Sequence, residues 1–373
     1  MFRLSNLIKS TLQEQKSRSL DGSIIIWNMT NRCNLLCHHC YSKASANEKE
    51  SLSLEDILKT IPKLKIANIN FVIFSGGEPL LRKDIFEIAQ CMKDNKIMTY
   101  LSTNGTYITE KNAQKIIDTF NYIGISIDGI GEVHDYFRGQ KGSYAKSIEA
   151  IKTIQKLGGN AGIRFTITKE TESSFYDIFT LAEELNVNKI YISHLVYSGR
   201  GKENLEIDIS KEKRKEYVNF MINKAFEYYE NGKDIDIVTG NMEMDAIMLL
   251  KEFEKKYPDF VNSLKNRLKS WGGNSAGKRL GNMDWNGFVK PDPFFPMTIG
   301  NYLEKDFDKI WLDDNNELLK KLREFPRNIK GKCSSCKYID ICNGGSRSRA
   351  YAISGDLWDE DPSCYLTLEE IKG

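Results

Sequence analysis

Three cysteines near the amino end form the first group of residues whose spacing could do chemistry. Cys33, Cys37 and Cys40 lie in "NRCNLLCHHC" with the spacing C-x3-C-x2-C. A structural zinc site is closed by four N or S ligands, whereas three thiolates can bind three irons of a 4Fe–4S cluster and leave the fourth iron open. The spacing therefore predicts a metal centre with a free coordination position. A zinc site completed by His38 or His39 is the alternative that spacing alone leaves open.

A second group of cysteines lies near the carboxyl end with the spacing C-x2-C-x5-C-x21-C: Cys333, Cys336, Cys342 and Cys364. Four thiolates can close either an iron–sulfur cluster or a zinc knuckle, and the pattern alone favours neither. The remaining cysteine, Cys91, lies on the apolar stripe of "IFEIAQCMKD" and is expected to be a small buried hydrophobic residue.

The composition predicts a globular cytoplasmic protein. The chain has 373 residues, of which 40% are hydrophobic and 28% charged, and a net charge of +2. This length suits one large α/β domain with a smaller one, and the near-balanced charge argues against a nucleic-acid partner. No apolar run approaches the roughly 20 residues of a membrane span, and "MFRLSNLIKS" is no signal peptide. In a reducing cytosol the cysteines are expected to bind metal and not to form disulfides.

Six short runs rich in Ile, Val, Phe and Tyr predict buried strands at 24–27, 70–74, 98–102, 122–127, 163–167 and 189–195. Amphipathic helical runs lie between them at 53–65, 83–95, 110–120, 144–158 and 175–185, and Ser53 with Asp56 forms a capping-box pattern. This alternation predicts the α/β class, as a partial (β/α)6 barrel with a parallel sheet. The first cysteine group follows the first strand, at the end where such barrels build active sites.

The rest of the chain divides by composition. We expect an N-terminal extension at 1–23, the barrel at 24–204, a lysine-rich helical connection at 205–270 and a small C-terminal domain at 271–373. The C-terminal domain begins with a Gly-, Asn- and Pro-rich stretch, in which "WNG" at 285–287 predicts a hairpin turn. A domain this short is expected to need a bound metal for stability, and the second cysteine group could bind one.

Several motifs at successive strand ends resemble the radical S-adenosylmethionine (SAM) superfamily. Tyr41 follows C-x3-C-x2-C, "SGGEP" (75–79) follows the second strand, "STNG" (102–105) the third, and "ISIDG" (125–129) ends the fourth. Each motif alone could be a turn, but the superfamily has them in this order. The resemblance implies a SAM-binding 4Fe–4S cluster on the first cysteine group. It implies SAM contacts by Tyr41, Gly76, Gly77, Glu78, Pro79, Ser102, Asn104, Ser126, Asp128, Leu195 and either Arg138 or Arg164.

The second cysteine group resembles the SPASM or twitch domain of the same superfamily, which implies an auxiliary 4Fe–4S cluster. A full SPASM domain has seven cysteines and two auxiliary clusters, but residues 271–332 contain no cysteine. One auxiliary cluster is therefore expected. The implied cofactors are two 4Fe–4S clusters and SAM.

Further motifs narrow the resemblance to the NirJ family of haem d1 biosynthesis: "WNMTNRCNLLCHHCYS", "SHLVYSGRG", "VTGN", "WGGNSAG" and "GDLWDEDPSCYLT". This implies a tetrapyrrole substrate, didecarboxysiroheme, which loses two propionate side chains through a 5′-deoxyadenosyl radical. Reduced ferredoxin or flavodoxin would donate the electron. Alternatives are the acetate-removing didecarboxysiroheme deacetylase of the alternative haem pathway, a radical SAM enzyme that modifies peptides, and a zinc-binding scaffold without activity.

A carboxylated macrocycle needs cations, and six basic residues lie in or beside these motifs: Arg200, Lys202, Lys278, Arg279, Arg347 and Arg349. His194 could bind the substrate iron or a carboxylate. Four aromatic residues could stack on the ring: Trp271, Trp285, Phe294 and Phe295. Each has a simpler interpretation as a solvated charge, a structural histidine or a core aromatic residue.

Overall fold

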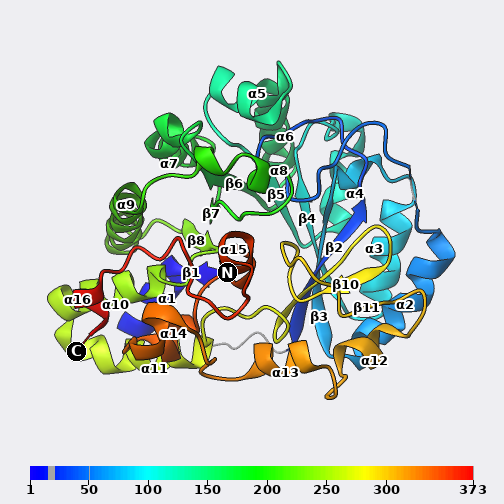
Figure 1. Cartoon of the computed structure of the whole chain (residues 1–373). Helices are drawn as coiled ribbons and strands as arrows, with labels where there is room; N and C mark the ends of the chain where they lie inside the picture. The colour runs from blue at the N-terminus through cyan, green and yellow to red at the C-terminus, as the bar shows by residue number, and fades with distance from the viewer. Residues whose placement is uncertain (16–21, 50, 373) are drawn as a thin grey trace.

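The computed structural model describes residues 1–15, 22–49 and 51–372, and one strongly curved sheet organises it (Figure 1). The strands follow the order β1-β8-β7-β6-β5-β4-β3-β2-β9-β10-β11. Their bounds are β1 Phe2–Arg3, β2 Ser23–Thr30, β3 Ile69–Gly76, β4 Met98–Thr103, β5 Tyr122–Ser126, β6 Ala161–Ile167, β7 Lys189–His194, β8 Asp236–Gly240, β9 Leu280–Met283, β10 Phe288–Lys290 and β11 Gly300–Asn301.

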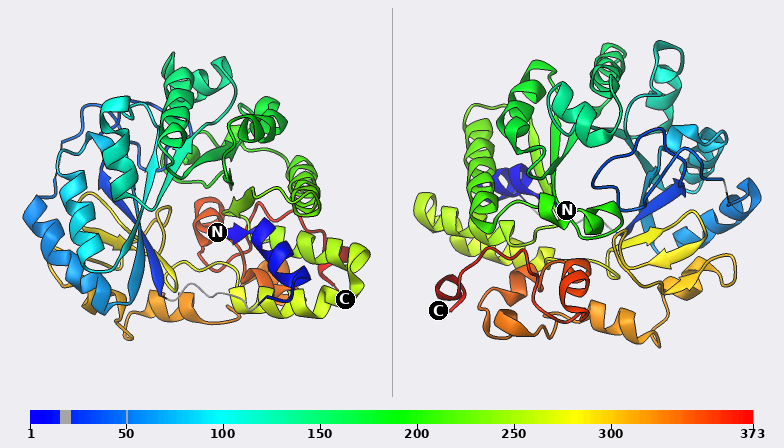
Figure 2. Two further views of the ribbon diagram at one scale, coloured as in Figure 1. Left: turned by 180° about the vertical axis from the view of Figure 1, so that it is seen from behind. Right: turned by 45° about the horizontal axis from the view of Figure 1, so that its top comes forward.

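The helices of the amino-terminal two thirds lie around this sheet, mainly on its outside (Figures 1 and 2). They are α1 Leu4–Leu12, α2 Leu54–Ile66, α3 Ile85–Asp94, α4 Glu110–Thr119, α5 Glu132–Arg138, α6 Ser143–Lys156, α7 Phe175–Glu184, α8 Arg200–Glu203, α9 Lys211–Glu230, α10 Asp245–Lys256 and α11 Val261–Trp271. Ser53 caps α2, as predicted, by accepting a hydrogen bond from the Asp56 amide.

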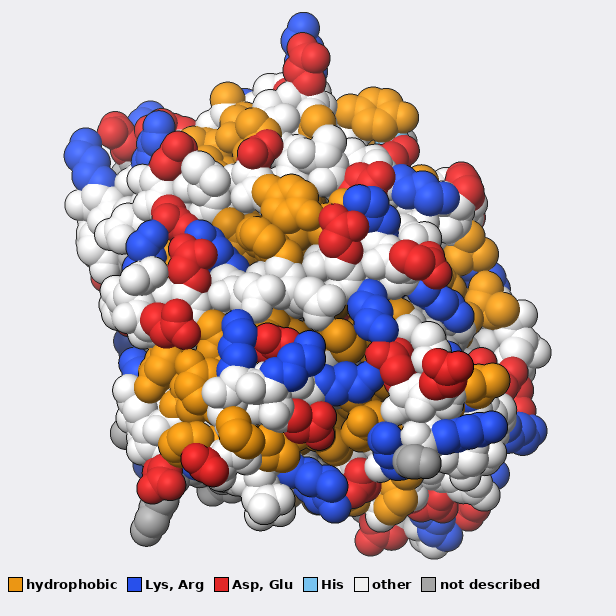
Figure 3. All heavy atoms as spheres, turned by 90° about the vertical axis from the view of Figure 1, so that its left-hand side faces the viewer, with side chains coloured by type: hydrophobic (Ala, Val, Ile, Leu, Met, Phe, Trp, Pro, Cys, Tyr) orange, Lys and Arg blue, Asp and Glu red, His pale blue; other side chains and the backbone are white. Residues whose placement is uncertain are grey.

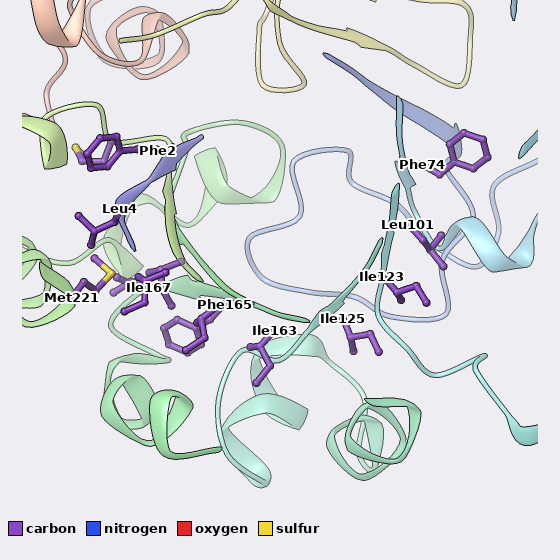
Figure 4. Packing of buried hydrophobic residues seen from close by; sticks show 14 of the residues in the cluster. Phe2, Leu4, Phe74, Leu101, Ile123, Ile125, Ile163, Phe165, Ile167 and Met221 are labelled. Carbon is purple, nitrogen blue, oxygen red and sulfur yellow. The ribbon is translucent and has the colours of Figure 1, made fainter. Parts of the chain in front are cut away.

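The six predicted strands are confirmed as β2 to β7, each parallel to the next. Side chains alternate between the two faces of a strand. On β5 and β6, Ile123, Ile125, Ile163 and Phe165 point outward to the helices and are buried there (Figure 4). The residues between them, including Arg164, therefore face the interior of the curved sheet.

The segment at 205–270 is not purely helical, which corrects the prediction. It contributes β8, a seventh strand parallel to β7. The short run "DIVTG" was overlooked because it lies among long lysine-rich helices. Within the predicted N-terminal extension, β1 pairs antiparallel with β8, whereas residues 16–21 lie outside the described residues.

The C-terminal part joins the same sheet at its other edge. β9 pairs parallel with β2, and β9 and β10 form the predicted hairpin, with Gly287 at a φ of +85°. The remaining helices are α12 Phe307–Trp311, α13 Glu317–Arg323, α14 Ile339–Cys342, α15 Arg347–Ser354 and α16 Leu368–Ile371. The helices α13, α14 and α15 lie across the opening between the two ends of the sheet (Figures 1 and 2).

Positive and negative side chains are interspersed on the face shown in Figure 3, in keeping with the net charge of +2. None of the helices in the described ranges has both the length and the apolar character needed to cross a membrane.

Candidate metal and cofactor site

The first cysteine loop, residues 31–41, leaves the carboxyl end of β2. Cys33 and Cys37 are each 8% exposed, Cys40 is partly exposed, and the three share one apolar cluster. Burial raises the pKa of Cys33 to about 12 and that of Cys37 to about 11. Such thiols become thiolates only when a bound cation offsets the cost of burying their charge. The loop thus offers three neighbouring soft ligands that fit an iron–sulfur cluster.

The glycines of "SGGEP" let the backbone after β3 lie against this loop. Gly76 has a φ of +131°, and a Cβ there would overlap the carbonyl oxygen of Thr30 at the end of β2, while a Cβ at Gly77 would overlap that of Arg32 in the loop. The Gly77 amide donates to the Thr30 carbonyl and the Glu78 amide to the Arg32 carbonyl, each at 2.8 Å. Glycine is required here because any side chain would push the two loops apart.

Glu78 joins the loops after β3 and β4. Its fully buried carboxylate accepts hydrogen bonds from the Thr103 hydroxyl at 2.7 Å and the Asn104 amide at 2.8 Å. Burial raises the pKa of this carboxyl, since the hydrogen bonds only partly offset desolvation. Pro79 then begins a single 3₁₀ turn, Pro79–Leu81. The Glu78 side chain thus joins the two loops by hydrogen bonds to Thr103 and Asn104.

Other predicted SAM contacts gather at the same edge of the sheet. The Tyr41 hydroxyl donates to Asn28 Oδ1 at 2.9 Å, and its ring meets the edge of Phe294 at 5.1 Å between centroids. Asn104 Nδ2 donates to Asn34 Oδ1 at 3.0 Å and so ties the loop after β4 to the first cysteine loop. Ser102 and Ser126 are partly exposed near the ends of β4 and β5.

Asp128 and Arg138 bind each other. Arg138 Nε donates to Asp128 Oδ2 at 2.7 Å, and the Thr166 amide donates to Asp128 Oδ1 at 2.6 Å. Burial alone would raise the pKa of Asp128, but the Arg138 charge and these contacts lower it. The Asp128 side chain is therefore committed to protein partners. Of the two arginines proposed for the SAM carboxylate, only Arg164 remains, partly exposed on the inner face of β6 with its guanidinium 4.5 Å from the Tyr191 ring centroid.

Three residues predicted to bind substrate, His194, Arg347 and Arg349, are buried and contact partners inside the protein instead. His194, 1% exposed, has Nδ1 at 3.1 Å from Arg214 Nη1 and Nε2 at 3.4 Å from Asp245 Oδ2. Arg347 donates to the carbonyls of the C-terminal loops, and Arg349 donates to Asp361 at 2.9 and 2.7 Å. Both arginines are 0% exposed, so neither reaches a ligand surface.

Arg200, which is partly exposed, donates hydrogen bonds to the backbone in and beside the first cysteine loop. Its Nε donates to the Cys37 carbonyl at 2.8 Å and its Nη1 to the Ala44 carbonyl at 3.2 Å. Leu195 is 1% exposed in a small apolar cluster with Phe137. The predicted macrocycle cations that stay exposed are Lys202, Lys278 and Arg279. Among the predicted aromatic residues, Phe295 is buried, while Trp271, Trp285 and Phe294 are partly exposed.

The four cysteines of the second group line one small cavity of about 10 Å³ next to α14. Main-chain amides direct hydrogen bonds to three of the sulfurs, from Tyr338 to Cys336, Gly344 to Cys342 and Leu366 to Cys364. Such hydrogen bonds tune iron–sulfur clusters, so the donor set fits one. Nowhere in the described ranges do three or more Cys, His, Asp or Glu side chains already hold a metal-binding geometry.

Sequence reasoning missed two buried carboxylates at the junction between the sheet and the C-terminal part. Glu243, 9% exposed, follows β8 and accepts from Asn274 Nδ2 at 3.1 Å, and Asp292 is 7% exposed. Burial raises the pKa of Glu243 and raises that of Asp292 to about 6. The strand-like "DIVTG" before Glu243 was the signal that could have found the first of them.

Comparisons with known proteins cover the whole chain. The family model "Radical SAM superfamily" matches residues 27–182. The chain is 36% identical to the pre-heme d1 synthase of Dinoroseobacter shibae, over 99% of this chain and 93% of that protein. It is also 36% identical to the Fe-coproporphyrin III synthase of Methanosarcina barkeri, over 93% of this chain and 89% of that protein. The crystal structure of Streptococcus suis SuiB bound to S-adenosylmethionine has a similar fold, with a TM-score of 0.71 at 17% identity, covering 92% of this chain and 77% of that chain.

Proposed function

The chain belongs to the radical SAM superfamily, and we propose that it removes two propionate side chains from didecarboxysiroheme in the formation of haem d1. The observation that supports this proposal is the similarity to pre-heme d1 synthase, which extends over 99% of the chain. Motifs from the first strand to the last cysteine carry the same resemblance. As a radical SAM enzyme with this C-terminal extension, the chain is related to haem synthases and not to zinc scaffolds.

Two cofactor sites follow from the donor sets. Cys33, Cys37 and Cys40 would hold the SAM-binding 4Fe–4S cluster, and the second cysteine group would hold an auxiliary one. When bound, the first cluster and SAM would supply the 5′-deoxyadenosyl radical needed to take a hydrogen atom from a side chain of the substrate. Reduced ferredoxin or flavodoxin is the proposed electron donor.

The chain itself would bind and orient the reactants. Arg164 offers a guanidinium to the SAM carboxylate on the inner face of β6, where stacking on Tyr191 fixes its plane. Tyr41 is held by Asn28 and would flank the adenine together with the Leu195 region. Exposed cations, among them Lys202 and Lys278, are the remaining candidates for the carboxylates of the macrocycle.

One alternative is supported by a relative of the same identity, which covers slightly less of the chain. The identity to Fe-coproporphyrin III synthase is also 36%, which favours removal of acetate groups from the same macrocycle. Peptide modification has weaker support, because the mycofactocin maturase of Mycolicibacterium smegmatis is 27% identical and the likeness to SuiB extends to the fold alone.

The test is a turnover experiment under anaerobic conditions with didecarboxysiroheme, SAM and a reductant. Mass spectrometry of the tetrapyrrole distinguishes loss of three-carbon propionate units from loss of two-carbon acetate units. Propionate loss together with 5′-deoxyadenosine is the expected result. Acetate loss would establish the alternative, and 5′-deoxyadenosine without any change in the tetrapyrrole would overturn both. The Cys91→Ala variant, altered far from both cysteine groups, should behave as wild type.

A further inference from the structure

One short segment, residues 194–200, contacts the ligand loops of both cysteine groups. It leaves the carboxyl end of β7 and enters α8 (Figure 1). We call it the bridging segment. Its two ends face different parts of the molecule, because α8 lies on the first cysteine loop whereas the end of β7 lies against the C-terminal part.

The carboxyl end of the bridging segment clamps the first cysteine loop. Arg200 Nε donates to the Cys37 carbonyl at 2.8 Å, and the Arg200 amide donates to the Cys40 carbonyl at 2.9 Å. Gly199 has a φ of +57°, and a Cβ there would overlap the Tyr41 carbonyl oxygen. These contacts hold the backbone at two of the three cysteines in a fixed position relative to Arg200.

The middle of the bridging segment holds the residue before Cys364. The Tyr197 hydroxyl donates to Asp208 Oδ2 at 2.6 Å and lies 2.9 Å from the Ser363 hydroxyl, which is free to donate to it. One tyrosine oxygen thereby connects the barrel to the backbone that presents the last cysteine of the second group. Tyr197 and Ser363 are separated by most of the C-terminal half of the chain, so this contact depends on the fold.

Tyr365, the residue after Cys364, lies near the bridging segment through a second set of contacts. The Tyr365 hydroxyl donates to Asp245 Oδ1 at 2.9 Å, and Asp245 Oδ2 lies 3.4 Å from His194 Nε2. On its other side His194 meets Arg214, which donates to both oxygens of Asp208 at 2.9 and 2.8 Å. Since Asp208 also accepts from Tyr197, the contacts form a ring around Cys364 that is open at one point, where His194 Nε2 and Asp245 Oδ2 approach each other without a hydrogen bond.

Arg349 reinforces this ring. Its Nη1 donates to the Leu195 carbonyl at 3.1 Å, while its other nitrogens bind Asp361, whose Oδ1 accepts from the Ser363 amide at 3.0 Å. The contacts of Arg349 with Leu195 and Asp361 are buried, so no water can replace a lost partner there, whereas the Tyr197 hydroxyl is only partly buried. A movement of the bridging segment must therefore move the Cys364 loop with it.

We propose that the bridging segment couples the two cysteine groups, so that SAM binding at the first cluster alters the auxiliary cluster through Tyr197 and Ser363. This rests on the two clusters of the proposed function. Tyr197 and Arg200 are positioning residues, since neither touches a predicted iron directly. A packed element with attachment points at both sites can carry such coupling when SAM binding moves it between two arrangements.

The experiment follows the auxiliary cluster by electron paramagnetic resonance (EPR) in reduced full-length protein. The triple variant Cys33→Ala, Cys37→Ala and Cys40→Ala retains only the second group and so identifies the auxiliary signal. In wild type, adding SAM should shift that signal. Tyr197→Phe, which removes only the bridging oxygen, should lose the shift while the first cluster still responds to SAM.

The matched control is Tyr228→Phe, which removes a tyrosine hydroxyl at 1% exposure that donates to Glu183 on the outer helices. This variant should keep the SAM-induced shift. A shift retained in Tyr197→Phe, or absent from wild type whose auxiliary cluster is present, refutes the coupling alone. A triple variant that binds no iron refutes the auxiliary cluster itself and the coupling with it.

Discussion

The ion pair between Arg349 and Asp361 gives the sharpest test of the interior roles assigned here. Both side chains are 1% exposed or less, and two hydrogen bonds of 2.9 and 2.7 Å join them. Arg349→Met would leave the Asp361 carboxylate buried without its counter-ion. It would also remove the donor to the Leu195 carbonyl at 3.1 Å. Breaking a buried pair in this way costs about 3–5 kcal/mol.

That loss corresponds to roughly a hundred- to few-thousand-fold change in the unfolding equilibrium. It should appear as a lower midpoint of urea unfolding, followed by far-UV circular dichroism on anaerobic protein. Adding Asp361→Asn should restore part of the loss, because the amide keeps an acceptor for the Ser346 or Ser363 amide without a buried charge. Lys330→Ala, which breaks an exposed pair with Asp356, is the control and should change the midpoint little.

An unchanged urea midpoint would instead indicate that Arg349 binds substrate. If Arg349 bound a carboxylate of the macrocycle, Arg349→Met would unfold at the wild-type urea concentration and would raise KM for the tetrapyrrole. That combination would refute the argument from burial.

Three further predictions follow from single residues. Cys33→Ala should abolish reductive cleavage of SAM, measured as 5′-deoxyadenosine; continued production would overturn the open-cluster assignment. Because burial raises the pKa of Asp292 from 3.8 to about 6, the unfolded chain loses this proton first, and stability should fall by about 3 kcal/mol as the pH rises from about 4 to about 6. Asp292→Asn should remove that part of the pH dependence of the urea midpoint, and an unchanged dependence would contradict the shift. Gly199→Ala should lower the iron bound per chain, whereas Gly158→Ala, which has a similar positive φ but no neighbour within 4 Å, should not; equal iron content in both would contradict the steric argument.

The parallel strands could be predicted because each of them has its own apolar run in the sequence. Runs such as "YIGISI" are apolar where they face the helices, and glycine or polar residues follow at the ends where ligands bind. The sequence signal for β8 is weaker, because Ile237 and Val238 are its only large apolar residues. The pairing of β9 with β2 has no local sequence signal. A parallel contact between segments over 250 residues apart depends on how the whole sheet closes.

The cysteines could be assigned from sequence because their chemistry lies in their spacing. Charged residues were assigned less well, because a basic residue in a motif looks the same whether it binds a ligand, water or a carboxylate inside the protein. His194 shows the difficulty: it ends a barrel strand, yet the alternation of β7 directs it outward to Arg214 and Asp245. The direction of that side chain depends on the strand register, which the motif does not reveal.

The irregular backbone of the C-terminal part explains why several of its arginines are buried. Most of that part is irregular, so its carbonyl groups lack the partners that helices and sheets provide. Arg347 donates to the carbonyls of Gly344, Leu357 and Asp359, and Arg327 donates to those of Leu322 and Ala276. A guanidinium carries five N–H donors in one plane and can satisfy several such carbonyls at once. These arginines therefore hold the loops that present the second cysteine group, which places them beside the predicted cluster without giving them a role in binding substrate.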